Sequence, residues 1–223
     1  MTNMNEKKLN LKQNIDFIRI LIYAAIVGLV AGTIGTLFTV SVNSVINLRI
    51  QYPWLIYLLP LGGVIIVLLY QLAKYKDAGT DLVINSIHSE PHLPVRVGPL
   101  IFVSSVITHL FGGSAGREGA ALQIGGSVGS FVSKALRLKE DDKKTLIMAG
   151  MSGCFSALFG TPLTAAIFPL EVVHVGYMQY AALLPCAIAS LIGHSVAIAL
   201  NLIEPMHHIG TVPNLDAITA IAV

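Results

Sequence analysis

Residues 112–129 read GGSAGREGAALQIGGSVG, and the only charges among them are the adjacent pair Arg117 and Glu118. The runs on either side of this pair, 97–116 and 119–133, contain no Asp, Glu, Lys or Arg. A charge at membrane depth costs ~2.5–3.5 kcal/mol on insertion scales, so it is seldom kept without a use. Because glycines precede Arg117, we expect the preceding helix to break and a new one to begin there. The free N–H groups and partial positive charge of the new helix would face whatever lies before its start.

The composition indicates a membrane protein. Of the 223 residues, 54% are apolar and 12% are charged, whereas a soluble domain is typically about a quarter charged. Most of the long uncharged runs reach or exceed the roughly 20 residues that cross the hydrocarbon. These runs are 20–48, 51–73, 97–116, 119–133, 145–170 and 172–203. The net charge of +2 gives no reason to expect a nucleic-acid partner, and Cys154 and Cys186 lie in apolar runs, where we expect no redox or metal role. The predicted fold is all-α and membrane-embedded.

Three clusters of basic residues orient the chain. They are Lys7, Lys8, Lys12 and Arg19; Lys74, Lys76 and Arg96; and Lys134, Arg137, Lys139, Lys143 and Lys144. By the positive-inside rule all three clusters face the cytoplasm. We therefore expect a multi-pass plasma-membrane protein with a cytoplasmic N-terminus, and we place Arg49 in an outer loop.

The expected organisation has three parts: a cytoplasmic amphipathic segment (1–14), a transmembrane unit (15–203), and an outer loop followed by the start of a further helix (204–223). Within the unit we expect a re-entrant half-helix at 79–88, because the segment is too short to span twice between two cytoplasmic clusters. The expected spans are 16–47, 54–74, 95–110, 117–138, 141–159, 162–173 and 177–202. The last apolar run, 215–223, stops after nine residues without a cap or charged anchor. It indicates a fragment or a truncated product of a longer gene.

The two interrupted helices suggest an anion site. Half-helix N-termini hold anions near the bilayer midplane in transporters, and here one such start lies near Arg117 and another at 79–81. Glu118 carries its own negative charge to the place of the anion, so it blocks the site when it occupies it and opens it when protonated or displaced. One residue can then couple proton and anion movement. We expect Arg117 to brace the loop by pairing with a carboxylate or carbonyl.

The sequence GREGA at 116–120, followed by QIGG at 123–126, resembles the gating-glutamate motif of the CLC chloride channel and antiporter family, commonly Gly-Lys/Arg-Glu-Gly-Pro. A re-entrant segment stands upstream, as in that family. Downstream, MAG at 148–150 through FGTPL at 159–163 resembles the family's next helix pair, which closes at Glu171. The resemblance covers essentially the whole chain, but only the first of the family's two inverted repeats.

The resemblance implies a halide transporter, either a voltage-gated chloride channel or an anion:proton antiporter, that works as a homodimer with one pore per subunit. Halide ions and protons are the implied partners, within a lipid bilayer; no cofactor, metal or enzymatic activity is implied. Glu118 would be the gate and the proton-coupling residue. The implied anion-binding residues are Gly79, Thr80, Asp81, Gly116, Arg117, Glu118, Gly119 and Ala120. The second repeat would supply a further helix start and a tyrosine, so this chain is not expected to transport alone.

Departures from the family pattern bear on the ion. The family's Gly-Ser-Gly-Ile-Pro is GTDLV at 79–83, so Thr80 matches the chloride-coordinating serine, and Ala120 replaces the usual proline. Both changes resemble the fluoride-exporting branch, and fluoride/proton exchange is narrowly favoured over chloride transport. Val172 stands where many antiporters carry an inner glutamate, although its neighbour Glu171 is retained, so the conventional proton route is in doubt.

Simpler roles remain open for the same residues. Glu118 could be an ion-pair partner of Arg117, Thr80 a helix cap, Asp81 a solvent-facing residue of the first turn, and Glu171 an anchor at a helix end. A passive chloride channel and a non-transporting membrane subunit or fragment are the alternative functions. An intramembrane enzyme would need a second catalytic group beside Glu118, and that helix offers none.

Overall fold

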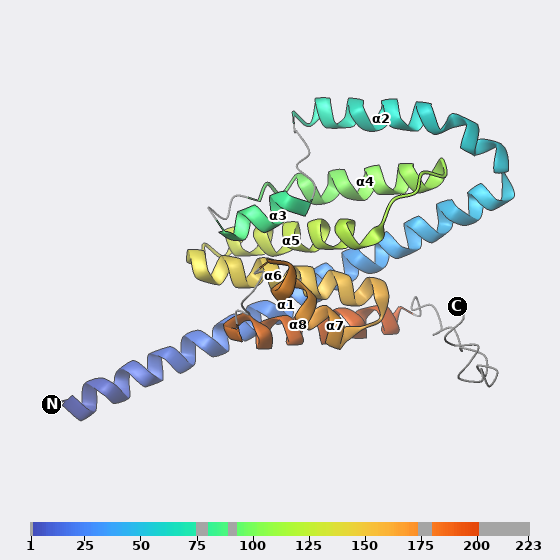
Figure 1. The fold of residues 1–223 in the computed structure, drawn as a ribbon. Coiled ribbons are helices and arrows are strands. Elements are labelled where there is room, and N and C mark those ends of the chain that lie inside the picture. The colour runs from blue at the N-terminus through green and yellow to red at the C-terminus, as the bar shows by residue number, and fades with distance from the viewer. Residues whose placement is uncertain (1, 75–79, 89–92, 174–179, 201–223) are drawn as a thin grey trace, which may run out of the picture.

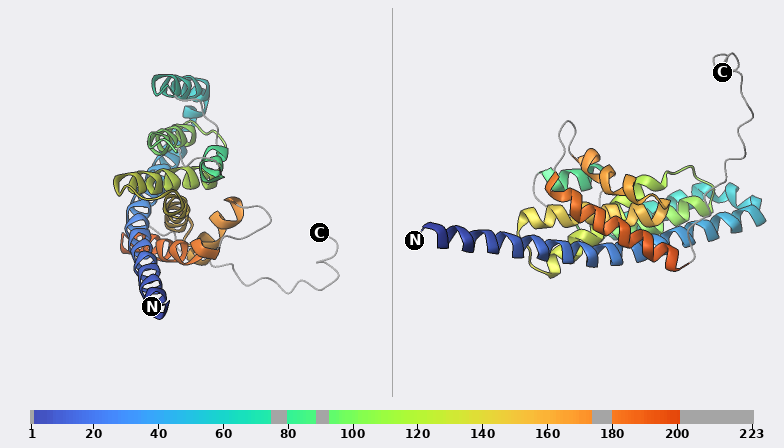
Figure 2. Two further views of the ribbon diagram at one scale, coloured as in Figure 1. Left: turned by 90° about the vertical axis from the view of Figure 1, so that its left-hand side faces the viewer. Right: turned by 90° about the horizontal axis from the view of Figure 1, so that it is seen from below.

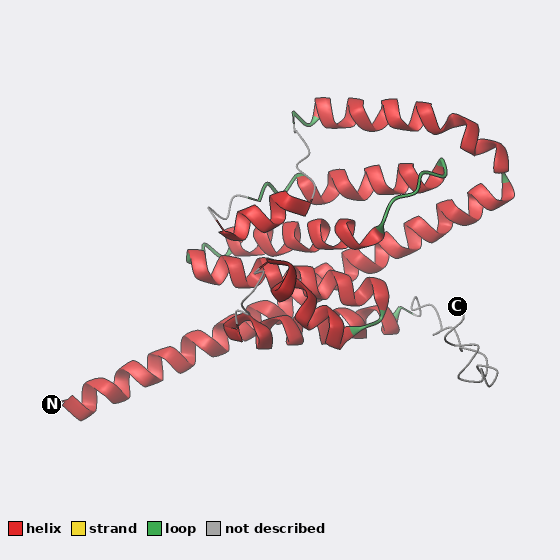
Figure 3. Cartoon of the chain, in the orientation of Figure 1, coloured by secondary structure: helices red, strands yellow, loops and turns green. Residues whose placement is uncertain are grey.

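A computed structural model describes residues 2–74, 80–88, 93–173 and 180–200, and within them the chain consists of helices and connecting loops (Figures 1 and 3). The elements are α1 (Thr2–Gln51), the 3-10 helix η1 (Pro53–Leu58), α2 (Leu59–Leu72), α3 (Thr80–His88), α4 (Val97–Leu110), α5 (Arg117–Ala135), α6 (Glu140–Phe159), α7 (Pro162–Val173), the 3-10 helix η2 (Tyr180–Ala182) and α8 (Leu183–Ala199). Three described segments are long and apolar enough to cross a membrane: Ile15–Gln51, Pro53–Leu72 and Tyr180–Ala199. The predicted all-α membrane fold is confirmed.

Helix α1 is longer than expected and has no break after residue 14. Residues 2–14 contain neither Gly nor Pro, so nothing in them interrupts the helix that continues into the apolar span. The helix ends at Gln51, two residues before Pro53, where Tyr52 leaves the helical conformation. Figure 1 shows α1 running obliquely across the other helices, as its excess length over a straight crossing requires.

The other helix bounds differ from expectation mainly at proline and beside the segments that the structure does not describe. The span expected at 54–74 is divided into η1 and α2, because Pro60 stands in the first turn of α2 and cannot donate a backbone hydrogen bond. The half-helix expected at 79–88 is α3, and α7 has the expected bounds. The span expected at 177–202 is η2 followed by α8, and the segment 204–223 lies outside the described residues.

Helix α6 forms the centre of the bundle. It packs against α1, α5, α7 and α8, and Figure 2 (left) shows these four helices around it. The close packing depends on glycine: a β-carbon on Gly150 of α6 would lie 2.2 Å from the backbone oxygen of Gly125 in α5. Gly193 of α8 meets Gly153 of α6 and Gly32 of α1 in the same way. Small residues therefore set the spacing of the helices, as is common inside membranes.

Replacing Gly150 by valine should force α5 and α6 apart. We expect the Gly150→Val protein to lose about 1–3 kcal/mol or more of folding free energy, because overpacking a tight contact costs that much. The thermal midpoint of the purified protein in detergent measures the loss. Gly63→Val on α2 is the matched control, since nothing lies within 4 Å of a β-carbon at Gly63. Equal losses in the two variants would contradict this picture of the core.

The residues of the basic clusters whose contacts the structure describes lie toward one end of the bundle. Arg19, which belongs to the first cluster, forms an ion pair of 3.6 Å with Asp142 near the start of α6. At the end of α5, Lys134 Nζ donates to the backbone oxygen of Leu93 at 3.0 Å, which holds the segment leading to Arg96 against the third cluster. This end is therefore rich in cations, and the start of α5 lies toward the other end.

Candidate functional site

Glycines separate α4 from α5. After α4 ends at Leu110, Gly112 has φ +82°, a conformation that a residue with a side chain rarely adopts. The backbone N–H groups of Gly112 and Gly113 donate to the oxygens of His109 and Thr108, which closes the end of α4. The chain then continues without helix to Gly116, which is extended (φ −70°, ψ 144°), and α5 begins at Arg117. The expected helix start is therefore present.

The start of α5 is recessed from the end of α1. Arg117 Nη1 donates to Oδ1 of Asn43 at 3.3 Å, so the expected partner is a side-chain carbonyl on α1. Asn43 lies eight residues before Gln51, the last residue of α1, which corresponds to about 12 Å along the helix. The loop that precedes α5 begins farther out, where Gly112 adjoins the side chains of Arg49 and Ile56. The loop therefore carries the chain from the rim of the bundle back inward.

The carboxylate of Glu118 is folded back over the start of its own helix. Glu118 is in the first turn of α5 and is exposed within the described part of the chain. Its Oε2 lies 2.6 Å from the position that a β-carbon on Gly116 would occupy. This places a negative charge beside the first N–H groups of α5, which have no partner within the helix. The carboxylate can reach this position only because residue 116 has no side chain.

The ion pair between Arg117 and Glu118, the simpler alternative for this glutamate, is absent among the described residues. The ion pairs found there are Arg19–Asp16, Arg19–Asp142 and Lys143–Glu140. The guanidinium of Arg117, next to Glu118 in the sequence, donates a hydrogen bond to Asn43 of α1 instead. Glu118 is thus left to interact with the helix start or with solvent, and an anion that reached the same N–H groups would compete with it.

A sequence model of the family described as "Voltage gated chloride channel" matches residues 61–223, which is most of the chain. The chain belongs to this family. The curated "Chloride/fluoride channel protein" of Pseudomonas syringae pv. tomato is 38% identical over 202 residues, covering 90% of this chain and 45% of that protein. The "H(+)/Cl(-) exchange transporter ClcA" of Vibrio campbellii is 30% identical over 168 residues, covering 68% and 36%.

Solved CLC structures give the same result. The crystal structure of a CLC-type fluoride/proton antiporter superimposes with a TM-score of 0.82 at 31% identity, covering 92% of this chain and 52% of that one. The structure of a slow cyanobacterial Cl⁻/H⁺ antiporter gives a TM-score of 0.64 at 25% identity, covering 80% and 46%. These values place the chain with the fluoride-type branch of the CLC family. The chain spans about half the length of these relatives.

The second helix start that the sequence predicts near the anion site is the start of α3 in this CLC chain. Helix α3 packs against α5, where a β-carbon on Gly126 would lie 2.9 Å from Cγ1 of Val83. Gly126 is eight residues beyond Glu118, or about 12 Å along α5. Asp81, in the first turn of α3, is exposed, and the described contacts do not bring it to Glu118. Gly79 and the side chain of Thr80 lie outside what the structure describes, so the roles expected for them stay predictions.

The remaining expected residues of the CLC site lie as follows. Gly119 is half-buried, and Ala120 is buried in the core. Glu171 is exposed near the end of α7, and Val172 beside it packs against the core. Asn43 accepts a hydrogen bond from Arg117, and this partner was not identified from the sequence. The available signal was an amide inside an uncharged span.

Proposed function

We propose that this CLC chain forms the first half of a pathway that exchanges halide for protons, with Glu118 as the gate and the proton-coupling residue. The observation that carries the proposal is the recessed start of α5 with the Glu118 carboxylate folded over Gly116. An unsatisfied helix start attracts any anion. A halide and the ionised carboxylate therefore compete for one place.

Protonation decides this competition. A neutral Glu118 loses its attraction to the helix start, so a proton arriving at the carboxyl releases the place to a halide. When the carboxyl ionises again it returns and expels the halide. This exchange needs no cationic side chain at the site, which agrees with Arg117 being bound to Asn43. It is the physical basis for coupling halide to protons.

The transported ion is proposed to be fluoride, narrowly favoured over chloride. Support comes from the names of two relatives, a chloride/fluoride channel protein and a fluoride/proton antiporter, and from their greater likeness to this chain. The substitutions at Thr80 and Ala120 point the same way. A passive chloride channel and a non-transporting subunit are the alternatives, and the conventional inner proton route stays in doubt because of Val172.

The proposed setting is the plasma membrane, with the N-terminus and the basic end of the bundle in the cytoplasm. The positive-inside rule supports this orientation, because Arg19, Lys134 and the segment leading to Arg96 lie toward one end. A homodimer is also proposed. Its support is the CLC membership of the chain, which implies a homodimer with one pore per subunit.

Proton-driven fluoride movement tests the proposal. Vesicles are reconstituted with the protein as its gene produces it, given more fluoride outside than inside, and then given an inward proton gradient. We expect fluoride to leave against its own gradient, and chloride to leave more slowly under the same conditions. A fluoride electrode and a pH-sensitive dye record the two fluxes. Halide movement that only runs down its gradient would favour the channel alternative, and no halide movement by folded protein would favour the subunit.

A further inference from the structure

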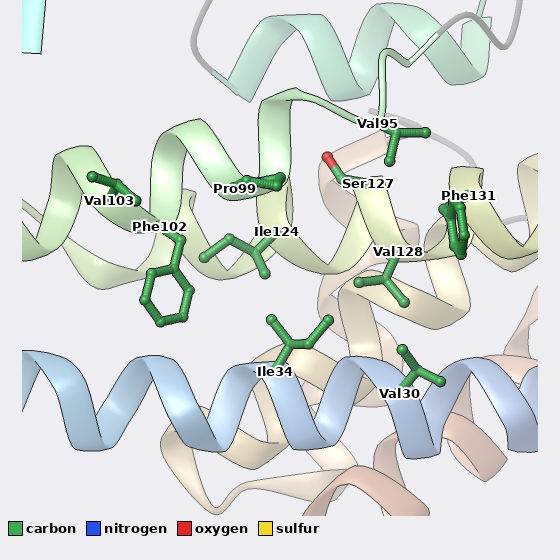
Figure 4. Close-up of a pocket in the computed structure, with 11 residues that line it drawn as sticks. Val30, Ile34, Val95, Pro99, Phe102, Val103, Ile124, Ser127, Val128 and Phe131 are labelled. Atoms are coloured by element: carbon green, nitrogen blue, oxygen red, sulfur yellow. The ribbon is translucent and has the colours of Figure 1, made fainter. Parts of the chain in front are cut away.

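A lateral groove lies between α1, α4 and α5 and plays no part in the site around Glu118. Its volume is about 460 Å³, and Figure 4 shows side chains of all three helices pointing into it. The lining includes Val30 and Ile34 of α1, Pro99 and Val103 of α4, and Ile124 and Phe131 of α5. The groove is thus bounded by helices of the transmembrane bundle itself.

The surface of the groove is hydrocarbon. Ser127 carries the single hydroxyl of the lining, is only 3% exposed, and lies against Gly98 within the contact between α4 and α5. By contrast Val103 and Phe131, on the rim, are 44% and 54% exposed. The groove therefore opens sideways, toward the space that lipid tails fill around a membrane protein. An unbranched acyl chain is the kind of ligand that such a surface binds.

One end of the groove is basic. Val95 and Phe131 lie together at this end in Figure 4. Arg96 follows Val95 directly, and Lys134 stands three residues beyond Phe131, on the same face of α5. Both cations are exposed.

The basic end is also held in place. Ser130 Oγ and Lys134 Nζ of α5 both donate to the backbone oxygen of Leu93, at 2.9 and 3.0 Å. These bonds fix the segment that carries Arg96 against the last turns of α5. The guanidinium of Arg96 has no hydrogen-bond or ion-pair partner among the residues that the structure describes. It is available to an anion at the mouth of the groove.

We propose that the groove binds an anionic phospholipid, with one acyl chain between α1, α4 and α5 and the phosphate at Arg96 and Lys134. The apolar lining of the groove would bind the acyl chain of the lipid, and the cations at one end would bind its negatively charged headgroup. A zwitterionic lipid offers the same tails without the net charge, so the site should prefer phosphatidylglycerol to phosphatidylcholine. A cation near the membrane surface favours an anionic lipid by roughly fivefold.

The test is photolabelling of the full chain in nanodiscs. Phosphatidylglycerol and phosphatidylcholine, each with a photoreactive acyl chain, are incorporated in separate samples, and adducts are located by mass spectrometry. We expect phosphatidylglycerol to label the peptides of α4 and α5 roughly 25-fold more than phosphatidylcholine does, since two cations contribute about fivefold each. The preference on α2, where Lys74 is one exposed cation, should be smaller. Arg96→Gln should lower the preference at the groove by about fivefold. Val103→Trp, which fills the rim of the groove, should reduce labelling with both lipids.

The matched controls are on α2, an exposed apolar helix that contributes no residue to the lining of the groove. Val64→Trp changes a valine that is 55% exposed, and Lys74→Gln removes an exposed cation at the end of the same helix. Neither should alter labelling of α4 and α5. The proposal is overturned if both lipids label the groove equally, which would mean non-specific bilayer contact only. It is also overturned if the groove stays unlabelled while α2 reacts, which would mean that protein covers it.

Discussion

Substitution of Glu118 by glutamine should abolish proton movement through the protein while leaving it folded. Glutamine has nearly the same shape as the protonated carboxyl but cannot ionise, so it can neither carry a proton nor compete with a halide for the start of α5. We expect halide-driven proton flux in vesicles to fall below about a tenth of the unaltered value, a loss worth 1.4 kcal/mol or more. The remaining halide flux should no longer depend on pH.

The control for this substitution is Glu171→Gln. Glu171 is the other glutamate near the family's proton positions, but it is exposed at the end of α7 and does not adjoin the start of α5. Its replacement should leave proton flux within a factor of about two. If Glu171→Gln removed proton movement and Glu118→Gln did not, the two roles would have been assigned to the wrong residues.

Addition of a single methyl group at residue 116 should displace the gate. Gly116 has φ −70° and ψ 144°, which alanine adopts without strain, so the helix start should survive the change. The new β-carbon would lie 2.6 Å from Oε2 of Glu118, and the carboxylate, as the flexible end of a side chain, would move away. An anion gains up to about 2 kcal/mol at a helix start. Halide flux of Gly116→Ala at neutral pH should therefore rise by roughly tenfold to thirtyfold.

A double substitution separates displacement of the gate from general damage. In a protein that already carries Glu118→Gln, Gly116→Ala should raise the halide flux at neutral pH little further, because the charge it displaces is gone. Gly63→Ala, in open space on α2, is the control for replacing a glycine. Fluxes are measured by halide efflux from vesicles. Fully additive effects would mean that residue 116 acts independently of the carboxylate.

Much of the fold follows from local signals in the sequence. The helix start at Arg117 follows from the glycines before it, and α7 begins at Pro162, a residue that favours the first turn of a helix. Glycines within apolar runs are typical of close helix contacts in membranes. Which helices meet there was not predictable, because the pairing of Gly125 with Gly150 depends on the arrangement of the whole bundle.

The candidate site was predictable in its residues and only partly in its geometry. The charge at 118 beside a broken helix is visible in the sequence, since two charges interrupt an apolar region. The partner of Arg117 was not identified, because Asn43 is 74 residues away and only the crossing of α1 over α5 brings the two together. The position of the carboxylate over Gly116 depends on side-chain conformation. The continuity of α1 through residues 2–14 is not visible in the sequence, because the polarity changes there while the helix continues.

Accessibility of a cysteine at position 118 tests the central claim most directly. Cys154 and Cys186 are fully buried, so a Glu118→Cys protein offers one reactive thiol among the described residues. We predict that a water-soluble methanethiosulfonate reagent modifies this thiol in vesicles and that added fluoride slows the reaction, because the halide occupies the space before α5. Val64→Cys, on the apolar surface of α2, should not react. A thiol at position 118 that is inert, or that reacts at a rate no halide changes, would contradict the account.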